Sequence, residues 1–144
     1  MKRFIALSVL IAGLSCCEGM HNDGERQEME MDKSDLYFMS SGGEQTVSIL
    51  NHERWKIAGG YEAAGYVDGN LHYRNYVCPE SSDGESADTY DILDGGWYHV
   101  RVPDKGNSNE AIITVDPNFP ACPRQATIQM QAGDAYTDII IYQP

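Results

Sequence analysis

The residues best suited to ligand binding are tyrosines concentrated in one part of the chain. Five of the nine tyrosines fall between about residues 61 and 94, together with Asn, Asp and Glu side chains. A tyrosine ring stacks on the apolar CH face of a pyranose, while its hydroxyl and neighbouring polar groups bond the sugar hydroxyls. The pattern predicts a carbohydrate site whose candidate residues are Tyr61, Tyr66, Tyr73, Tyr76 and Tyr90.

The same tyrosines have a second interpretation, as a small satellite core beneath a long loop. The two tryptophans favour a structural role more strongly. Trp55 and Trp97 each head a segment with alternating apolar residues, where a large ring usually packs between sheets. Trp97 follows Gly95 and Gly96, however, so partial exposure keeps it among the candidate ligand-binding residues. Exposure of the rings decides between the two interpretations.

Cys78 and Cys122 are the two cysteines within the predicted domain. An oxidising compartment would allow them to pair. A disulfide closing the 43 intervening residues would add roughly 4 kcal/mol in the chain-entropy model, and two unpaired thiols are the alternative. We expect no metal site and no cofactor, because the histidines show no close ligand spacing with either cysteine.

No motif indicates catalysis. The chain has no Gly-x-Ser-x-Gly elbow, no HExxH and no glycine-rich phosphate loop, and its four histidines are scattered without an evident nucleophile. A carboxylate pair for glycoside hydrolysis stays open, because the separation of such a pair is spatial. A sandwich of about 110 residues offers little room for a deep active cleft. We therefore predict that the protein is not an enzyme.

Length and charge limit the partners further. A chain of 144 residues is enough for one hydrophobic core. Its 10 Lys+Arg against 22 Asp+Glu give a net charge of −12. Nucleic-acid binding depends on clustered Lys and Arg, and the sequence has no such cluster. We expect no nucleic-acid partner.

Residues 1–17 have the pattern of a signal peptide. Lys2 and Arg3 precede an apolar run over residues 4–14, which is the order of a secretory signal. The run is well below the roughly 20 apolar residues that span a bilayer. The segment is therefore predicted to direct export and then to be removed.

The end of this run resembles a bacterial lipoprotein signal, in which lipid is attached to a cysteine and cleavage occurs before it. Cys17 has Leu14 and Ser15 at the preferred distances but has Cys16 where a small residue is usual. Cys16 follows the small Ser15 but lacks a leucine at the right distance. The resemblance implies that one of the two is lipidated and that the protein is anchored in the outer membrane, on its periplasmic or cell-surface face. An ordinary secretory signal is the alternative.

Residues 18–34 are predicted to form a flexible acidic tether. From 18 to 35 there are seven acids, two bases and no aromatic or β-branched residue. Such a segment cannot bury enough surface to order itself. Loss of the two basic signal residues takes the net charge from −12 to about −14, so the exported chain is more acidic still. A plain disordered terminus is the alternative, and in either case the folded domain is predicted to span residues 35–144.

The predicted domain has the two-residue periodicity of β-strands. Short β-branched runs such as 45–50 and 111–115 are separated by Gly, Pro, Asn and Asp, and no window of eleven residues carries a helical stripe. This predicts an all-β sandwich or barrel of six to eight strands. The tyrosine-rich segment 61–94 is a long insertion between the third strand and the strand of Trp97, and within it 71–77 could add a strand.

A set of residues occurs along the domain in a recognisable order, namely Gly43, Val47, Ile49, Trp55, Trp97, Val100, Val102, Asn118, Arg124, Ala126–Ile128 and Gln143. This order resembles the BACON family, the immunoglobulin-like β-sandwich of surface and secreted proteins in gut Bacteroidota. The resemblance covers residues 35–143, although about forty residues separate the two tryptophans where the family usually has a shorter connection.

The BACON resemblance implies an immunoglobulin-like fold and a non-catalytic accessory protein that binds glycan, such as mucin or a polysaccharide. In the family, the matching arginine strand and terminal glutamine are structural, so they bear on fold more than on activity. The second hypothesis is a structural or protein-interaction module, a spacer of a cell-surface complex that contacts its partner through a strand edge or the insertion.

Overall fold

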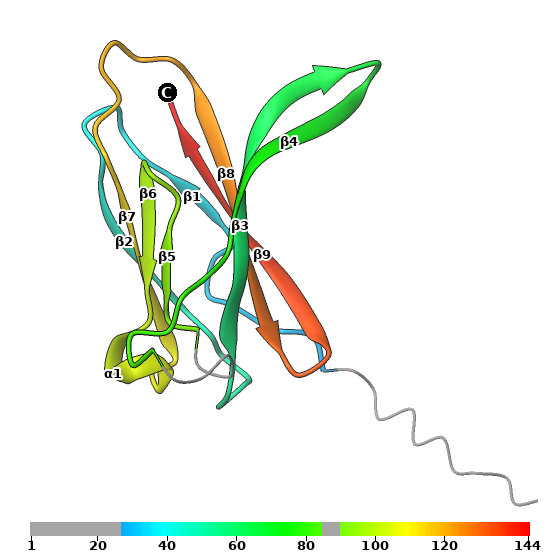
Figure 1. Cartoon of the computed structure of the whole chain (residues 1–144), viewed down its shortest axis with the longest axis vertical. Coiled ribbons are helices and arrows are strands. Elements are labelled where there is room, and N and C mark those ends of the chain that lie inside the picture. The colour runs from blue at the N-terminus through cyan, green and yellow to red at the C-terminus, as the bar shows by residue number, and fades with distance from the viewer. Residues whose placement is uncertain (1–26, 85–89) are drawn as a thin grey trace, which may run out of the picture.

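The computed structural model describes residues 27–84 and 90–144. These parts of the chain form nine strands and one short helical turn, arranged as two packed sheets (Figure 1). The all-β sandwich that the two-residue periodicity predicts is therefore confirmed. The elements are β1 (Asp35–Tyr37), β2 (Gly43–Ser48), β3 (Lys56–Val67), β4 (Asn70–Val77), β5 (Ile92–Asp94), β6 (Tyr98–Arg101), α1 (Pro103–Gly106), β7 (Glu110–Val115), β8 (Arg124–Ala132) and β9 (Ala135–Gln143).

The predicted number of strands, six to eight, is too low. The insertion contributes both β4, which matches the possible strand at 71–77, and the unpredicted β5. β5 has three residues and pairs with β6, with Ile92 opposite Arg101. A strand this short shows no periodicity of its own, so the sequence carried no signal for it.

The strand order is β1-β9-β8-β3-β4 in one sheet and β2-β7-β6-β5 in the other. β1 runs parallel to β9, with Leu36 opposite Ile141, and the other pairings between these strands are antiparallel. Alternate residues point inward, as Ala126, Ile128 and Met130 do in β8. These inward side chains fill one hydrophobic core between the two sheets.

β3 and β4 form a long hairpin that extends past the rest of the sandwich (Figure 1). β3 pairs with β8 as far as Glu62 opposite Ala126, and it pairs with β4 from Gly60, opposite Val77, to the hairpin tip. The two-residue turn at Asp68 and Gly69 has φ angles of 52° and 80°, which suit a tight hairpin. The predicted insertion is thus mainly an extension of the sheet, and β3 continues through Gly59 and Gly60.

The chain from Gln27 to Ser34 is packed on the domain, so the tether predicted for 18–34 is wrong over this part. Met29 is only 6% exposed and belongs to the core. Backbone bonds join Leu50 N–H to Glu30 C=O and Asp32 N–H to Ser48 C=O. The composition of residues 27–34 gave no sign of this packing. The apolar residues of the segment are two methionines, spaced so that they lie on the same side of an extended chain.

Cys78 and Cys122 are free and exposed, so the predicted disulfide is wrong. The strand register gives the reason. Cys78 follows Val77, which lies across β3 from Ile128, whereas Cys122 precedes the first residue of β8, Arg124. Four strand residues span about 13 Å, well beyond the roughly 7 Å between Cα atoms that a disulfide tolerates.

Several predictions fall on residues outside the described parts. They are the signal peptide at 1–17 with its candidate lipidation sites Cys16 and Cys17, and the tether over 18–26. Within residues 27–84 and 90–144, no helix is long and apolar enough to cross a membrane.

Candidate functional site

Three of the predicted tyrosines lie together on the β3–β4 hairpin. Tyr61 and Tyr73 come from neighbouring strands, and their rings meet edge to face with centroids 4.6 Å apart and planes at 74°. Tyr76 follows on β4 and borders the same hollow. Tyr73 is 55% exposed and Tyr76 is 63% exposed. The Tyr73 and Tyr76 rings therefore lie on the surface, and the satellite-core interpretation does not describe them, whereas Tyr61 is half-buried beside them.

The hollow between these rings, the hairpin pocket, has a volume of about 420 Å³ and is lined by Tyr61, Tyr73, Arg74, Asn75 and Tyr76. Arg74 Nε lies 3.4 Å from Oε2 of Glu62, and Asn75 Nδ2 donates to the same oxygen at 3.2 Å. Asn75 has a left-handed φ of 52°, which asparagine tolerates better than most residues. Guanidinium, amide and phenol groups are thereby gathered beside aromatic faces.

A glycine in β3 makes room for Tyr76. The Tyr76 hydroxyl donates to the backbone carbonyl of Ala58 at 3.3 Å. A Cβ atom at Gly59 would lie 2.5 Å from the Tyr76 hydroxyl oxygen, closer than any side chain tolerates. Gly59 therefore allows the Tyr76 ring to lie across β3, next to Tyr61.

Tyr61 and Asp138 share the outer face of the five-stranded sheet. Burial, followed by the charge of Asp138 and the neighbouring Tyr73, raises the pKa of Tyr61 above 10.0, although a hydrogen bond with Thr127 acts in the opposite direction. Burial also raises the pKa of Asp138 above 3.8. The Tyr61 phenol is therefore neutral near pH 7 and keeps its hydroxyl as donor and acceptor.

A second and larger hollow, the end groove, has a volume of about 610 Å³. It lies where the hairpin passes the ends of β8 and β9. Tyr66, 75% exposed, borders it on the hairpin side. Tyr37 and Tyr142 border it on the other side as a stacked pair, with centroids 4.9 Å apart and planes at 11°. The lining residues are Tyr37, Phe38, Ala63, Ala64, Gly65, Tyr66, Leu71, Arg74, Pro123, Arg124, Gln125, Tyr142, Gln143 and Pro144.

Sequence reasoning missed Tyr37 and Tyr142. Each follows a buried residue, Leu36 or Ile141, so strand alternation places its ring on the outer face. What the sequence does not show is that β1 and β9, from opposite ends of the domain, pair in parallel and bring the two rings together. The sequence could have shown that the first and last strands each carry an outward tyrosine. It could not have shown that these two strands pair with each other.

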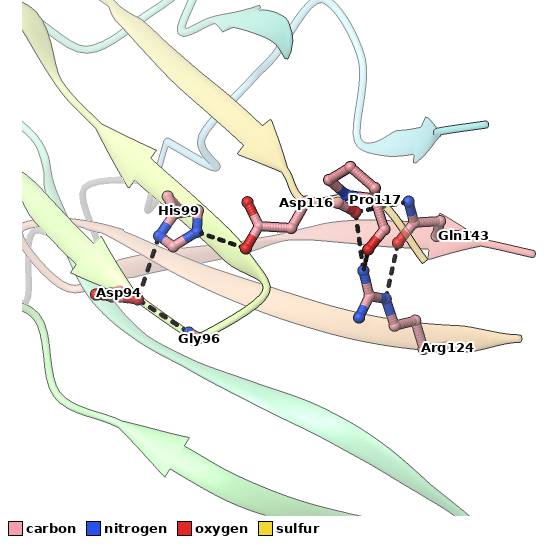
Figure 2. A network of polar contacts seen from close by, with 7 residues as sticks. All are labelled: Asp94, Gly96, His99, Asp116, Pro117, Arg124 and Gln143. Atoms are coloured by element: carbon pink, nitrogen blue, oxygen red, sulfur yellow. Dashed lines mark hydrogen bonds and ion pairs between the residues drawn. The ribbon is translucent and has the colours of Figure 1, made fainter. Parts of the chain in front are cut away.

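Beside the end groove, Arg124 and Gln143 tie three segments together, as Figure 2 shows. Arg124 Nε donates to Oε1 of Gln143 at 2.7 Å, and Arg124 Nη2 donates to the Asp116 carbonyl at 2.9 Å. Gln143 Nε2 donates to the carbonyls of Met39 and Asp116, both at 3.0 Å. Gln143 is 2% exposed, and burial lowers the pKa of Arg124. This network joins the loop after β7 to the ends of β8 and β9.

The same network continues to a histidine (Figure 2). His99 Nδ1 lies 3.2 Å from Oδ1 of Asp94, and His99 Nε2 lies 3.4 Å from Oδ2 of Asp116. Both ring nitrogens therefore face carboxylates of the protein. Among the residues that the structure describes, no group of three or more His, Cys, Asp or Glu side chains could hold a metal ion.

The remaining two candidates, Tyr90 and Trp97, lie apart from both hollows. Tyr90 has the Lys56 ammonium 5.6 Å from its ring centroid, at the opposite end of β3 from Tyr66. The Arg124 guanidinium covers one face of the Trp97 ring at 4.2 Å, and Tyr98 meets it edge-on. Trp97 thus has the packing role that its position in the sequence favours, and Trp55 is in the core at 6% exposure.

Comparisons with known proteins bear on the fold alone. No family model matches the chain, and no curated protein matches it. Among solved structures, the chain is similar to an NMR structure of a protein from Bacteroides thetaiotaomicron, with a TM-score of 0.57 and 22% sequence identity. The similarity covers 85% of this chain and 91% of that one, so the β-sandwich architecture is shared over most of both proteins.

Proposed function

We propose that this protein is an exported, lipid-anchored β-sandwich of the immunoglobulin type that binds glycan without catalysis. The observation that carries the proposal is the group formed by exposed Tyr73 and Tyr76 and half-buried Tyr61 around the hairpin pocket. A long hairpin with two register shifts, together with Gly59, which makes room for the Tyr76 ring, produces this arrangement. Aromatic side chains grouped on an exposed surface are typical of an interaction site.

The chemistry of the hairpin pocket suits a sugar. A pyranose presents apolar CH faces to the aromatic rings and hydroxyls to polar neighbours. Because Tyr61 and Tyr73 meet at 74°, the site is an angled recess for one sugar unit rather than a flat strip. Asn75, Arg74 and the Tyr61 hydroxyl provide both donors and acceptors at its edge.

The direction of the chain supports a lipid-anchored orientation. The described part begins with Gln27, whose carbonyl lies 3.0 Å from Nε2 of His52, in the loop before β3. Tyr66 lies ten residues beyond the start of β3, or about 30 Å along the strand. Figure 1 shows the described chain beginning at the end of the sandwich opposite the C-terminus and the hairpin tip. A chain leading from an N-terminal anchor to Gln27 would therefore reach the sandwich at the end opposite the hairpin tip.

The glycan proposal is tested by applying the full chain, in detergent, to a broad glycan array and then measuring affinities of variants for the sugars bound. We expect Tyr73→Ala and Tyr76→Ala each to weaken binding about tenfold or more, because each removes a stacking face. Tyr136→Ala is the matched control, since Tyr136 is also 55% exposed but lines neither hollow. Absence of binding across the array would overturn the proposal.

The lipid anchor has its own test, by mass spectrometry of membrane-extracted protein. We expect a diacylglyceryl group on the N-terminal cysteine. Separate Cys16→Ala and Cys17→Ala variants identify the acceptor, because only one of them abolishes the modification. An unmodified, freely soluble chain would contradict lipid anchoring and would leave the glycan proposal standing.

The alternative function, a protein-interaction module of a surface complex, rests on β4. This strand is at the edge of its sheet, and an edge strand has unpaired backbone groups that can accept a partner strand. A Pro substitution at His72, in β4, would weaken such pairing. If partner capture from cells is lost in His72→Pro but kept in Tyr73→Ala and Tyr76→Ala, the interaction hypothesis replaces the glycan hypothesis.

A further inference from the structure

The end groove has a charge character unlike that of the chain as a whole. The protein carries 22 Asp+Glu against 10 Lys+Arg, yet the described residues that line the groove include Arg74 and Arg124 and no acidic residue. The rest of the lining is aromatic, aliphatic or amide. In a strongly acidic protein, a hollow bordered by two guanidinium groups selects for negative charge in its occupant.

Arg74 is the arginine positioned to meet a ligand. Its side chain is 62% exposed and it lines both the end groove and the hairpin pocket. Within the described chain, its ion pair is made by Nε with Glu62. The two terminal nitrogens of the guanidinium therefore remain for a second acceptor, and they have the paired geometry that binds a carboxylate through two parallel bonds.

Arg124 has a different role because it is already held in place. Its Nε and Nη2 groups donate to Gln143 and to the Asp116 carbonyl, and its guanidinium covers Trp97. It contributes positive charge to the wall of the groove without being free to turn toward a ligand. The acidic groups beside the groove are Glu62, paired with Arg74, Asp116, which faces His99, and Asp35, which is hydrogen-bonded to the Tyr142 side chain.

The aromatic walls of the groove complement this charge. Tyr66 on the hairpin and the Tyr37–Tyr142 stack on the opposite side provide ring faces, and 610 Å³ is in the range of hollows that hold small ligands. A uronic or sialic acid has both features that such a site needs: an apolar CH face and a carboxylate on the same ring.

We infer that the end groove binds an anionic saccharide, a sugar whose carboxylate is held by Arg74 while its ring contacts Tyr66. This inference deepens the proposed function and rests on it. It extends binding from the hairpin pocket into the end groove, with Arg74 shared between the two. An acidic peptide has the same charge but lacks the CH face that the tyrosines suit.

The inference is tested with matched sugars that differ in charge. Affinities of the full chain in detergent are measured for trigalacturonate and its methyl ester, and for sialyllactose and its methyl ester. We expect the charged member of at least one pair to bind about tenfold more tightly or better, as charge-assisted bonds to arginine are strong. The preference should shrink when salt is raised, because the groove is open to solvent.

Three variants assign the preference to its residue. Arg74→Gln should abolish the charged-over-neutral ratio, and Arg74→Lys should keep part of it, because lysine retains the charge but not the paired donors. Arg101→Gln is the control, since Arg101 is exposed on the other sheet at β6 and should leave the ratio unchanged. Circular dichroism confirms that each variant is folded.

The outcomes separate the two proposals. Equal binding of the charged and neutral members, or a preference that persists in Arg74→Gln, overturns the anionic inference and leaves glycan binding intact. Failure of all four sugars, with other array glycans still bound through Tyr73 and Tyr76, also overturns it alone. Binding of poly-glutamate in an Arg74-dependent manner without any sugar binding overturns both proposals in favour of an acidic peptide.

Discussion

Tyr98 is fully buried in the core, and its ring packs directly against the backbone of two glycines. Its hydroxyl has no hydrogen-bond partner among the described residues, and burial, with the charge of Glu62 as a second cause, raises the pKa of Tyr98 to about 12. Cβ atoms at Gly60 and Gly95 would lie 2.7 Å and 2.2 Å from its side-chain atoms. The two glycines therefore make space for the ring.

We expect Tyr98→Phe to stabilise the fold by up to about 1 kcal/mol, because it removes a buried polar group that has no partner and keeps the ring. Gly95→Ala should instead destabilise the fold by about 3 kcal/mol or more, because its methyl group would overlap the Tyr98 ring. Urea unfolding measures both changes. A Tyr98→Phe variant destabilised by more than 1 kcal/mol would show that the hydroxyl is bonded.

Asp138 is expected to make stability depend on pH. Burial raises the pKa of Asp138 in the folded chain above 3.8, so the folded chain holds this proton more tightly than the unfolded chain. Its contribution is most favourable below 3.8 and is lost as the pH rises through the folded-state pKa. Asp138→Asn should therefore raise Tm by about 1–2 °C at pH 7 and change it little near pH 3, which thermal unfolding at the two pH values checks. A gain of equal size at both pH values would contradict this cause.

Among the elements, the loop after β7 is joined to β9 by Gln143. Gln143 is buried and bonds Arg124, Met39 and Asp116. We expect Gln143→Ala to cost about 2–3 kcal/mol, because it leaves buried partners unpaired. Gln129→Ala, on the outer face of the neighbouring strand β8, is the control and should cost less than 1 kcal/mol. Equal losses in the two variants would mean that the network adds no stability.

Local patterns predicted the elements much better than their pairing. Alternation in β2 and the turn residues around β7 were sufficient to place both strands, and the run 71–77 was sufficient to suggest β4. The stack of Tyr37 on Tyr142 and the separation of Cys78 from Cys122 depend on which strands are neighbours, and in what register. Those contacts join residues that are distant along the chain, so no local periodicity encodes them.

At the scale of the whole molecule, the N-terminal segment determines where the folded domain starts. Residues 27–34 pass along the end of β2, with Met29 in the core and Met31 bridged to Ile49. Asn51 closes the contact from the following loop, where its Oδ1 accepts from Glu30 N–H at 2.9 Å. The acidic composition of the segment concealed this, since charged residues can face water while their methionine neighbours are buried.

A chain that starts at Asp35 should therefore be less stable than one that starts at Gln27, by about 2–4 kcal/mol, because it loses the burial of Met29 and the backbone bonds to β2. Urea unfolding of the two chains measures the difference. Met29→Ala in the longer chain is the matched variant and should reproduce a large part of it, which would assign the effect to the core contact rather than to chain length. Coincident unfolding curves for the two chains would instead mean that residues 27–34 add no stability and belong to the flexible tether. In that case the hollows would be held away from the anchor by a longer flexible segment, with less control over the direction in which they face.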